Sequence, residues 1–170
     1  AGSDQAKMTV SRAVSETFEP GSIGKVFTMS GMIQLGLHQA SDKFTVPDHI
    51  TTNGQTYIDA TTHGDEHWTL AGILEQSSNV GMIIAAEKMS NEQRYEFISK
   101  FGIGQDNGLG LPGEAGGLLS SDDQWDLRTQ NTVLFGQAYT TNALQLTNAV
   151  AVIANKGVKK PQRIIKAISD

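Results

Sequence analysis

Residues 18–25 read FEPGSIGK, and this stretch places a hydroxyl and an amine close together at the start of an expected helix. Pro20-Gly21 ends the preceding segment, and apolar residues at helical spacing then run from Ser22 to about Leu37. Ser22 and Lys25 lie three residues apart, so their side chains share one helix face. Serine is a favoured helix N-cap, but a serine beside a neutral lysine is also a nucleophile with its base. Spacing alone favours the cap, because a chain of this length contains about one S-x-x-K by chance.

The composition indicates one globular domain. The 170 residues are 38% hydrophobic and carry a net charge of -5, and no basic cluster exceeds Lys159-Lys160, which argues against a nucleic-acid partner. The absence of cysteine excludes disulfides, thiolate catalysis and cysteine metal ligands. No apolar stretch reaches the length of a membrane span. The start AGSDQAKM is too polar for a signal peptide, so we interpret residues 1–11 as a leader or as residues added for expression.

Helical patterns dominate the rest of the chain. We expect helices from Thr69 to Glu75 and over 80–89, 91–100 and 143–155, and a helical turn around Trp125. Capping-box spacing opens two of these helices, at Ser90 with Gln93 and at Asn142 with Gln145. Residues 41–67 predict irregular loop with short extended pieces, and 102–117 predict a glycine-rich loop. The tail 162–169 gives the only expected strand, at the C-terminal edge.

Ser77-Ser78-Asn79 interrupt two apolar helical segments. A turn or a cap explains this break without any chemistry. In the functional interpretation, Ser77 and Asn79 project into a cleft, where the hydroxyl relays a proton and the amide holds a substrate amide. The pattern occurs once and does not decide between these interpretations by itself.

Four blocks in order give these residues a context: FEPGSIGKVFTM, QSSNVGM, FGIG with GLPGEAGGLL, and FGQAYTTNALQLTNAVAVIANKG. Together they resemble the transpeptidase domain of class B penicillin-binding proteins, the acyl-serine D,D-transpeptidases of bacterial cell-wall synthesis. The resemblance covers about residues 12–170 and implies an α+β fold of the serine β-lactamase/D,D-transpeptidase type. This chain would be mainly its α-helical lobe, with a strand starting near the C-terminus.

The resemblance implies a mechanism and its residues. Ser22 would be the nucleophile and Lys25 its base, Ser77 would relay a proton, and Asn79 would position both the lysine and the substrate amide. The implied ligands are the D-Ala-D-Ala end of a peptidoglycan stem peptide and β-lactam antibiotics, and no metal or organic cofactor is required. The implied location is the outer face of the bacterial cell membrane, among other cell-wall synthesis or division proteins.

The sequence departs from the family at one point. Neither Lys-Thr-Gly nor Lys-Ser-Gly, the third motif of the family, occurs in the 170 residues. The strand with this motif supplies one of the two oxyanion N–H donors in the family, and Ser22 supplies the other. We therefore expect this chain alone to be inactive and to be completed by the remainder of the transpeptidase domain, including flanking sheet strands, in the parent chain or in another chain. The alternative is a non-catalytic β-lactam sensor or protein-interaction module of the same fold.

Other candidate sites fail on their context. Gly108-x-Gly110-x-x-Gly113 fits a dinucleotide fingerprint, but it follows a helix rather than a strand. His63 and His67 have the spacing of a zinc helix, but Gly64 and the lack of periodicity indicate a loop. We expect both tryptophans to be core or loop anchors, and Asp122-Asp123 to be helix-cap charges rather than a glycosidase pair.

Overall fold

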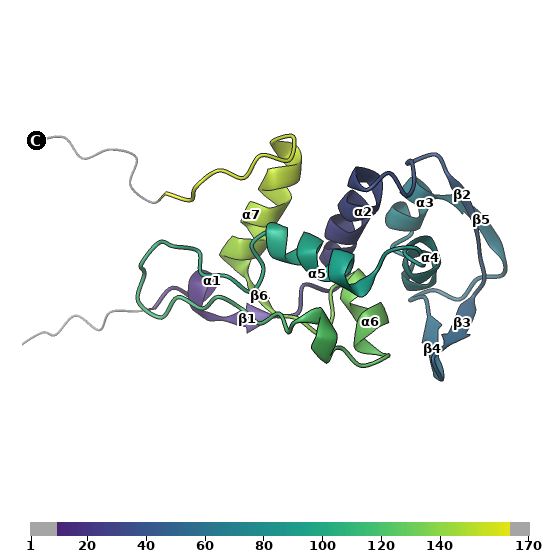
Figure 1. Cartoon of the computed structure of the whole chain (residues 1–170), viewed down its shortest axis with the longest axis horizontal. Helices are drawn as coiled ribbons and strands as arrows, with labels where there is room; N and C mark the ends of the chain where they lie inside the picture. The colour runs from purple at the N-terminus through teal and green to yellow at the C-terminus, as the bar shows by residue number, and fades with distance from the viewer. Residues whose placement is uncertain (1–9, 164–170) are drawn as a thin grey trace, which may run out of the picture.

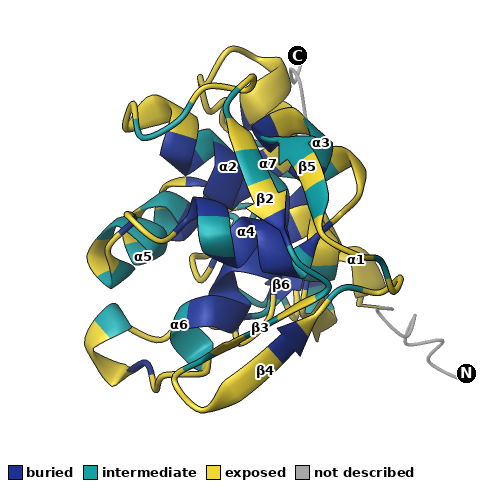
Figure 2. Cartoon of the chain, turned by 90° about the vertical axis from the view of Figure 1, so that its right-hand side faces the viewer, coloured by how far each residue is buried: buried dark blue, intermediate teal, exposed yellow. Residues whose placement is uncertain are grey.

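Two helices, α2 (Gly24–Gln34) and α4 (Asn79–Ala85), form the buried centre of the protein (Figure 2). Their inward faces meet α3 (Leu70–Glu75) in the largest apolar cluster, in which Met32, Ile73 and Met82 are fully buried. The computed structural model describes residues 10–163. None of its helices over that range is long and apolar enough to cross a membrane.

More exposed helices surround this centre (Figure 1). They are α1 (Arg12–Ser15), α5 (Asn91–Lys100), α6 (Thr129–Thr132) and α7 (Ala143–Ala154), with the 3-10 turns η1 (Gly21–Ile23), η2 (Asp122–Gln124) and η3 (Val133–Phe135). Both predicted capping boxes are present, at Ser90 before α5 and at Asn142 before α7. The predicted cap of α3 is present as well, since the Thr69 side chain accepts a hydrogen bond from the Gly72 N–H.

The prediction of a single strand at the C-terminal edge is wrong for the described residues. Three antiparallel pairs form instead, listed here with their bounds: β1 (Thr17–Phe18) with β6 (Thr141–Asn142), β2 (Lys43–Val46) with β5 (Glu66–Thr69), and β3 (His49–Thr52) with β4 (Gln55–Ile58). The last two pairs lie at one end of the molecule, in the segment for which we expected irregular loop (Figure 1). Asn53 and Gly54 adopt φ of 53° and 73°, which is the backbone that a two-residue hairpin turn needs. Most of the expected tail strand, 164–169, lies outside the described residues.

The start of the first helix also differs from the prediction. Ser22 is not the N-cap, because η1 already begins at Gly21 and runs directly into α2. The Ser22 hydroxyl makes no capping bond in this arrangement, so it is not occupied by the helix backbone. The helix over 80–89 is shorter than predicted and ends at Ala85.

A close approach between η1 and the end of η3 fixes the position of the Ser22 turn. The Gly21 N–H donates to the Gly136 carbonyl at 2.9 Å. A Cβ on Gly24 would lie 2.5 Å from the Gly136 Cα, and a Cβ on Gly136, whose φ is +80°, would lie 1.9 Å from the Gly21 carbonyl oxygen. Only glycine fits at these two positions, which explains Gly24 in FEPGSIGK and Gly136 in FGQ.

Candidate active site

Lys25 is the most deeply buried charged side chain of the site, with 1% of its surface exposed. It projects from the first turn of α2, and its Nζ lies 3.1 Å from the Ser22 Oγ. The same Nζ donates to the Ser77 carbonyl at 2.5 Å and lies 3.0 Å from the Ser77 Oγ. The structure therefore brings Ser22, Lys25 and Ser77 together, although Ser77 is far along the chain.

Burial changes the acid–base chemistry of this amine. Loss of solvation disfavours the ammonium form and lowers the pKa of Lys25 to about 8, against a partly opposing attraction to the Asp59 carboxylate. Near neutral pH a useful fraction of Lys25 is thus uncharged, with a lone pair that can accept a proton. This geometry is that of a serine nucleophile, Ser22, beside its lysine base, Lys25. It is not that of a helix cap beside a surface lysine.

The turn that follows α3 presents Ser77 to Lys25. Ser77 adopts a left-handed backbone with φ of 55°, which reverses the chain between the two helices. Ser78 is the N-cap of α4 and accepts a hydrogen bond from the Gly81 N–H at 2.7 Å. The sequence break is therefore both a cap and a site turn, with Ser78 as the cap and Ser77 facing the lysine.

Asn79 lies beside this group but does not contact Lys25. Its side-chain Nδ2 donates to the Ile58 carbonyl at 3.2 Å. Asn79 lines a cleft of about 290 Å³ together with Ser22 and Ser77. Of the four predicted site residues, Lys25 contacts both Ser22 and Ser77, and Asn79 shares a cleft with those two serines.

Comparison with known proteins agrees with this arrangement. Residues 2–170 match the penicillin binding protein transpeptidase domain. The chain belongs to this transpeptidase family. It is similar to a peptidoglycan synthetase from Bifidobacterium adolescentis, with 76% identity, a TM-score of 0.93, and coverage of 98% of this chain and 30% of that one. Penicillin-binding protein 3 of Mycobacterium tuberculosis, solved with ampicillin, is 41% identical with a TM-score of 0.88, over 91% of this chain and 34% of that one.

The name of one curated relative states a reaction. The peptidoglycan D,D-transpeptidase FtsI of Escherichia coli is 32% identical over 91% of this chain and 26% of its own length. The transpeptidase chain described here spans about a quarter of the length of such curated relatives. Its helix-rich architecture with small sheets confirms the predicted helical lobe of the α+β fold.

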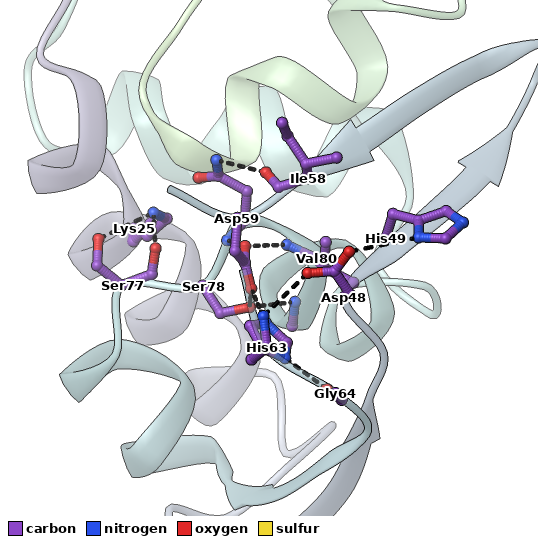
Figure 3. A network of polar contacts seen from close by, with 12 residues as sticks. Lys25, Asp48, His49, Ile58, Asp59, His63, Gly64, Ser77, Ser78 and Val80 are labelled. Atoms are coloured by element: carbon purple, nitrogen blue, oxygen red, sulfur yellow. Dashed lines mark hydrogen bonds and ion pairs between the residues drawn. The ribbon is translucent and has the colours of Figure 1, made fainter. Parts of the chain in front are cut away.

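Two residues that the sequence analysis did not select as site residues, Asp59 and His63, line the same cleft (Figure 3). The Asp59 carboxylate, with a side chain 7% exposed, lies directly behind the Ser77 turn. It accepts hydrogen bonds from the Ser78 hydroxyl at 2.6 Å and from the Asn79 N–H at 2.5 Å. Burial alone would raise its pKa, but these and its other hydrogen bonds outweigh burial and lower it.

His63 and His67, which the sequence analysis considered and rejected as zinc ligands, have different hydrogen-bond partners. The His63 Nε2 lies 3.0 Å from the Asp59 Oδ2, whereas His67 faces Thr45 across the β2–β5 pair. Over residues 10–163, no three acidic or histidine side chains gather in a way that could hold a metal ion. Trp125 is buried in the core, and Trp68 packs against His63 at the cleft.

Proposed function

We propose that this chain is the part of an acyl-serine D,D-transpeptidase that carries its nucleophile and general base. The complete enzyme cross-links peptidoglycan stem peptides and is acylated by β-lactams. The observation that carries this proposal is the buried Lys25 amine, 3.1 Å from the Ser22 hydroxyl and 3.0 Å from the Ser77 hydroxyl. The transpeptidase family and the name of the Escherichia coli relative support the reaction class.

In the first step, neutral Lys25 takes the proton of the Ser22 hydroxyl. The Ser22 oxygen attacks the carbonyl carbon of the penultimate D-alanine, and the negative charge moves onto the carbonyl oxygen. The Ser22 N–H is one donor to this oxyanion. The second donor is expected from the strand that bears Lys-Thr-Gly or Lys-Ser-Gly in the family.

In the second step, the bond to the terminal D-alanine breaks. The proton now held by Lys25 passes through the Ser77 hydroxyl to the leaving nitrogen. D-alanine then departs as a free amino acid with a neutral amino group. An ester between Ser22 and the stem peptide remains. The amine of a neighbouring stem peptide then attacks this ester, returns a proton to Ser22 and forms the cross-link. With a β-lactam the leaving nitrogen stays tethered to the acyl group, so the ester persists.

Asn79 acts on the substrate rather than directly on the lysine. Its Nδ2 is held by the Ile58 carbonyl, which leaves its Oδ1 able to accept a hydrogen bond from a substrate amide N–H at the cleft. The role in orienting the lysine then belongs to the Ser77 turn, which Asn79 adjoins.

The proposed setting follows from the family. The complete protein acts on the outer face of the bacterial cytoplasmic membrane, where its substrate lies, together with other cell-wall synthesis or division proteins. The remainder of the transpeptidase domain completes the oxyanion site. No metal or organic cofactor takes part in the proposed steps.

The test is intact-mass spectrometry of the parent protein after incubation with a penicillin. An adduct that is lost in Ser22→Ala supports the proposal, and the absence of an adduct in the unmodified protein would overturn it. Release of D-alanine from a stem pentapeptide then separates an enzyme from a β-lactam sensor, because a sensor forms the adduct without this turnover. The 170-residue chain alone is expected to acylate far more slowly than its parent.

A further inference from the structure

The Asp59 carboxylate joins two segments of the site that are separated along the chain. Its Oδ2 accepts from the Ser78 hydroxyl at 2.6 Å, and its Oδ1 accepts from the N–H groups of Asn79 at 2.5 Å and Val80 at 3.0 Å. The Asn79 side chain returns a hydrogen bond to the carbonyl of the residue before Asp59. The end of β4 is therefore fixed to the first residues of α4 by hydrogen bonds in both directions (Figure 3).

The hydrogen bonds between Asp59 and residues 78–80 lie next to the contact between Ser77 and Lys25. Ser77 offers both its carbonyl and its hydroxyl to the Lys25 Nζ from a left-handed backbone conformation that is unfavourable for serine. Such a conformation persists only where the surroundings impose it. The three donors that Asp59 holds come from residues 78, 79 and 80, which follow Ser77 directly.

His63 completes the carboxylate's set of partners. Its Nε2 faces the Asp59 Oδ2 at 3.0 Å, and its Nδ1 faces the Gly64 carbonyl oxygen at 2.6 Å. Because each ring nitrogen meets an acceptor, the doubly protonated imidazolium is favoured, and the pKa of His63 is raised, mainly by the Gly64 carbonyl and then by Asp59. The ring is held from its side by Trp68, with centroids 5.0 Å apart.

We propose that Asp59, with His63 behind it, is a positioning residue for acylation: it fixes the Ser77–Asn79 turn against Lys25 and places a negative charge in the cleft lined by the two serines that contact that amine. This proposal deepens the proposed function and rests on it. Asp59 touches neither the Ser22 hydroxyl nor the expected position of the substrate carbonyl, so it acts through Ser77 and through its charge.

The other titratable groups around Lys25 do not offer the same effect. Glu66 and His63 line the cleft together with Asp59, and the Tyr139 hydroxyl lies close to Gly24 at the start of α2. Asp48 accepts a hydrogen bond from the backbone N–H of His63, and its Oδ2 lies 3.7 Å from the His49 Nδ1. Asp59 is the carboxylate whose attraction opposes the loss of the Lys25 charge.

The distinguishing experiment is the pH profile of acylation in the parent protein carrying Asp59→Asn. Asparagine keeps the shape and can still accept from the α4 N–H groups, but it has no charge. Removing the negative charge destabilises the lysine ammonium, so the midpoint of the acid limb should fall by roughly half a unit to one unit. The rate on the plateau should also fall, by about tenfold, because the Ser77 turn is held less firmly.

Ser78→Ala is the matched control for a purely structural effect. It removes one donor to Asp59 and the cap of α4 while the carboxylate stays charged. It should lower the plateau rate without lowering the midpoint. If Asp59→Asn has the same midpoint as Ser78→Ala and the unmodified protein, the charge part of the proposal is wrong. If Asp59→Asn keeps the full plateau rate, the positioning part is wrong.

A second variant covers the case in which Asp59→Asn does not fold. His63→Ala removes the side chain that faces the Asp59 Oδ2 at 3.0 Å, so Asp59 holds the Ser77–Asn79 turn less firmly and the plateau rate should fall. An unchanged plateau rate would overturn the positioning part of the proposal. If the unmodified parent is not acylated at all, the proposed function has failed rather than this inference.

Discussion

Acylation of Ser22 should depend steeply on pH below about 8, because the base must be uncharged. With the pKa of Lys25 lowered to about 8, about 1% of the amine is neutral at pH 6, about half at pH 8 and about 90% at pH 9. The second-order rate constant for acylation should therefore rise about fiftyfold from pH 6 to pH 8 and less than twofold from pH 8 to pH 9. An ordinary lysine with a pKa near 10.5 would instead give a rate that still rises about tenfold per unit above pH 8.

The assay is stopped-flow or gel-based labelling of the parent protein with a fluorescent penicillin that has no titrating group between pH 5.5 and 9.5. Alkaline hydrolysis of the antibiotic is measured in parallel and subtracted. Lys25→Arg is the control, since a guanidinium stays protonated and should lose about 10²- to 10⁴-fold in rate with no rising limb. In the parent protein, further burial of Lys25 or an added cation near it would lower the pKa of Lys25, and with it the midpoint of the pH profile. A midpoint above about 9, or a rising limb that persists in Lys25→Arg, would refute the role of Lys25 as the base.

Three further predictions concern the free energy of unfolding of the parent protein, measured by urea denaturation. Gly24→Ala should cost at least about 1–3 kcal/mol, because its Cβ would lie 2.5 Å from a backbone atom; Gly64→Ala, with nothing within 4 Å, is the control and should change little. Equal effects of the two would contradict the close approach. Tyr139→Phe removes a buried hydroxyl that has no hydrogen-bond partner among residues 10–163, so it should be neutral or stabilising, and a loss above about 1 kcal/mol would reveal a missed partner. Asn142→Ala should cost about 2 kcal/mol or more, since its buried side chain caps α7 and donates to the Val14 and Ala115 carbonyls; a cost below about 0.5 kcal/mol would argue against these bonds.

Features set by local rules could be predicted from the sequence. The capping boxes at Ser90 and Asn142 and the cap at Thr69 depend on residues three positions apart, and all three are present. The pairing of Ser22 with Lys25 is local in the same sense. The meeting of this pair with Ser77 was expected only from the family resemblance, because it joins residues 52 positions apart.

The two strand pairs β2–β5 and β3–β4 were underestimated because their strands are four residues long and largely polar. Strands such as HITT and QTYI have one buried residue between them, so alternation is hardly visible in the sequence. Asn53-Gly54 was the available signal, since this dipeptide favours a two-residue hairpin turn.

Asp59 could not be selected from the sequence for a related reason. An aspartate in a polar loop is normally a solvated charge, and its donors come from residues 19 to 21 positions further on. Only the packing of β4 against α4 turns it into a buried acceptor. The cap assigned to Ser22 was wrong for a local reason, because the 3-10 turn η1 already begins one residue earlier, at Gly21.

The glycine contact between Gly21 and Gly136 has a consequence for the order of folding. It closes a loop of 115 residues, from 21 to 136, and the turn that bears Ser22 is anchored at that closure. Contacts this distant in sequence form late, because the entropy of loop closure must be overcome before they contribute stability. A chain still emerging from the ribosome, or partly unfolded, would have Ser22 and Lys25 in local proximity but no fixed wall behind them. The nucleophile therefore becomes reactive only at the end of folding, so labelling by a penicillin would report the fraction of fully folded molecules.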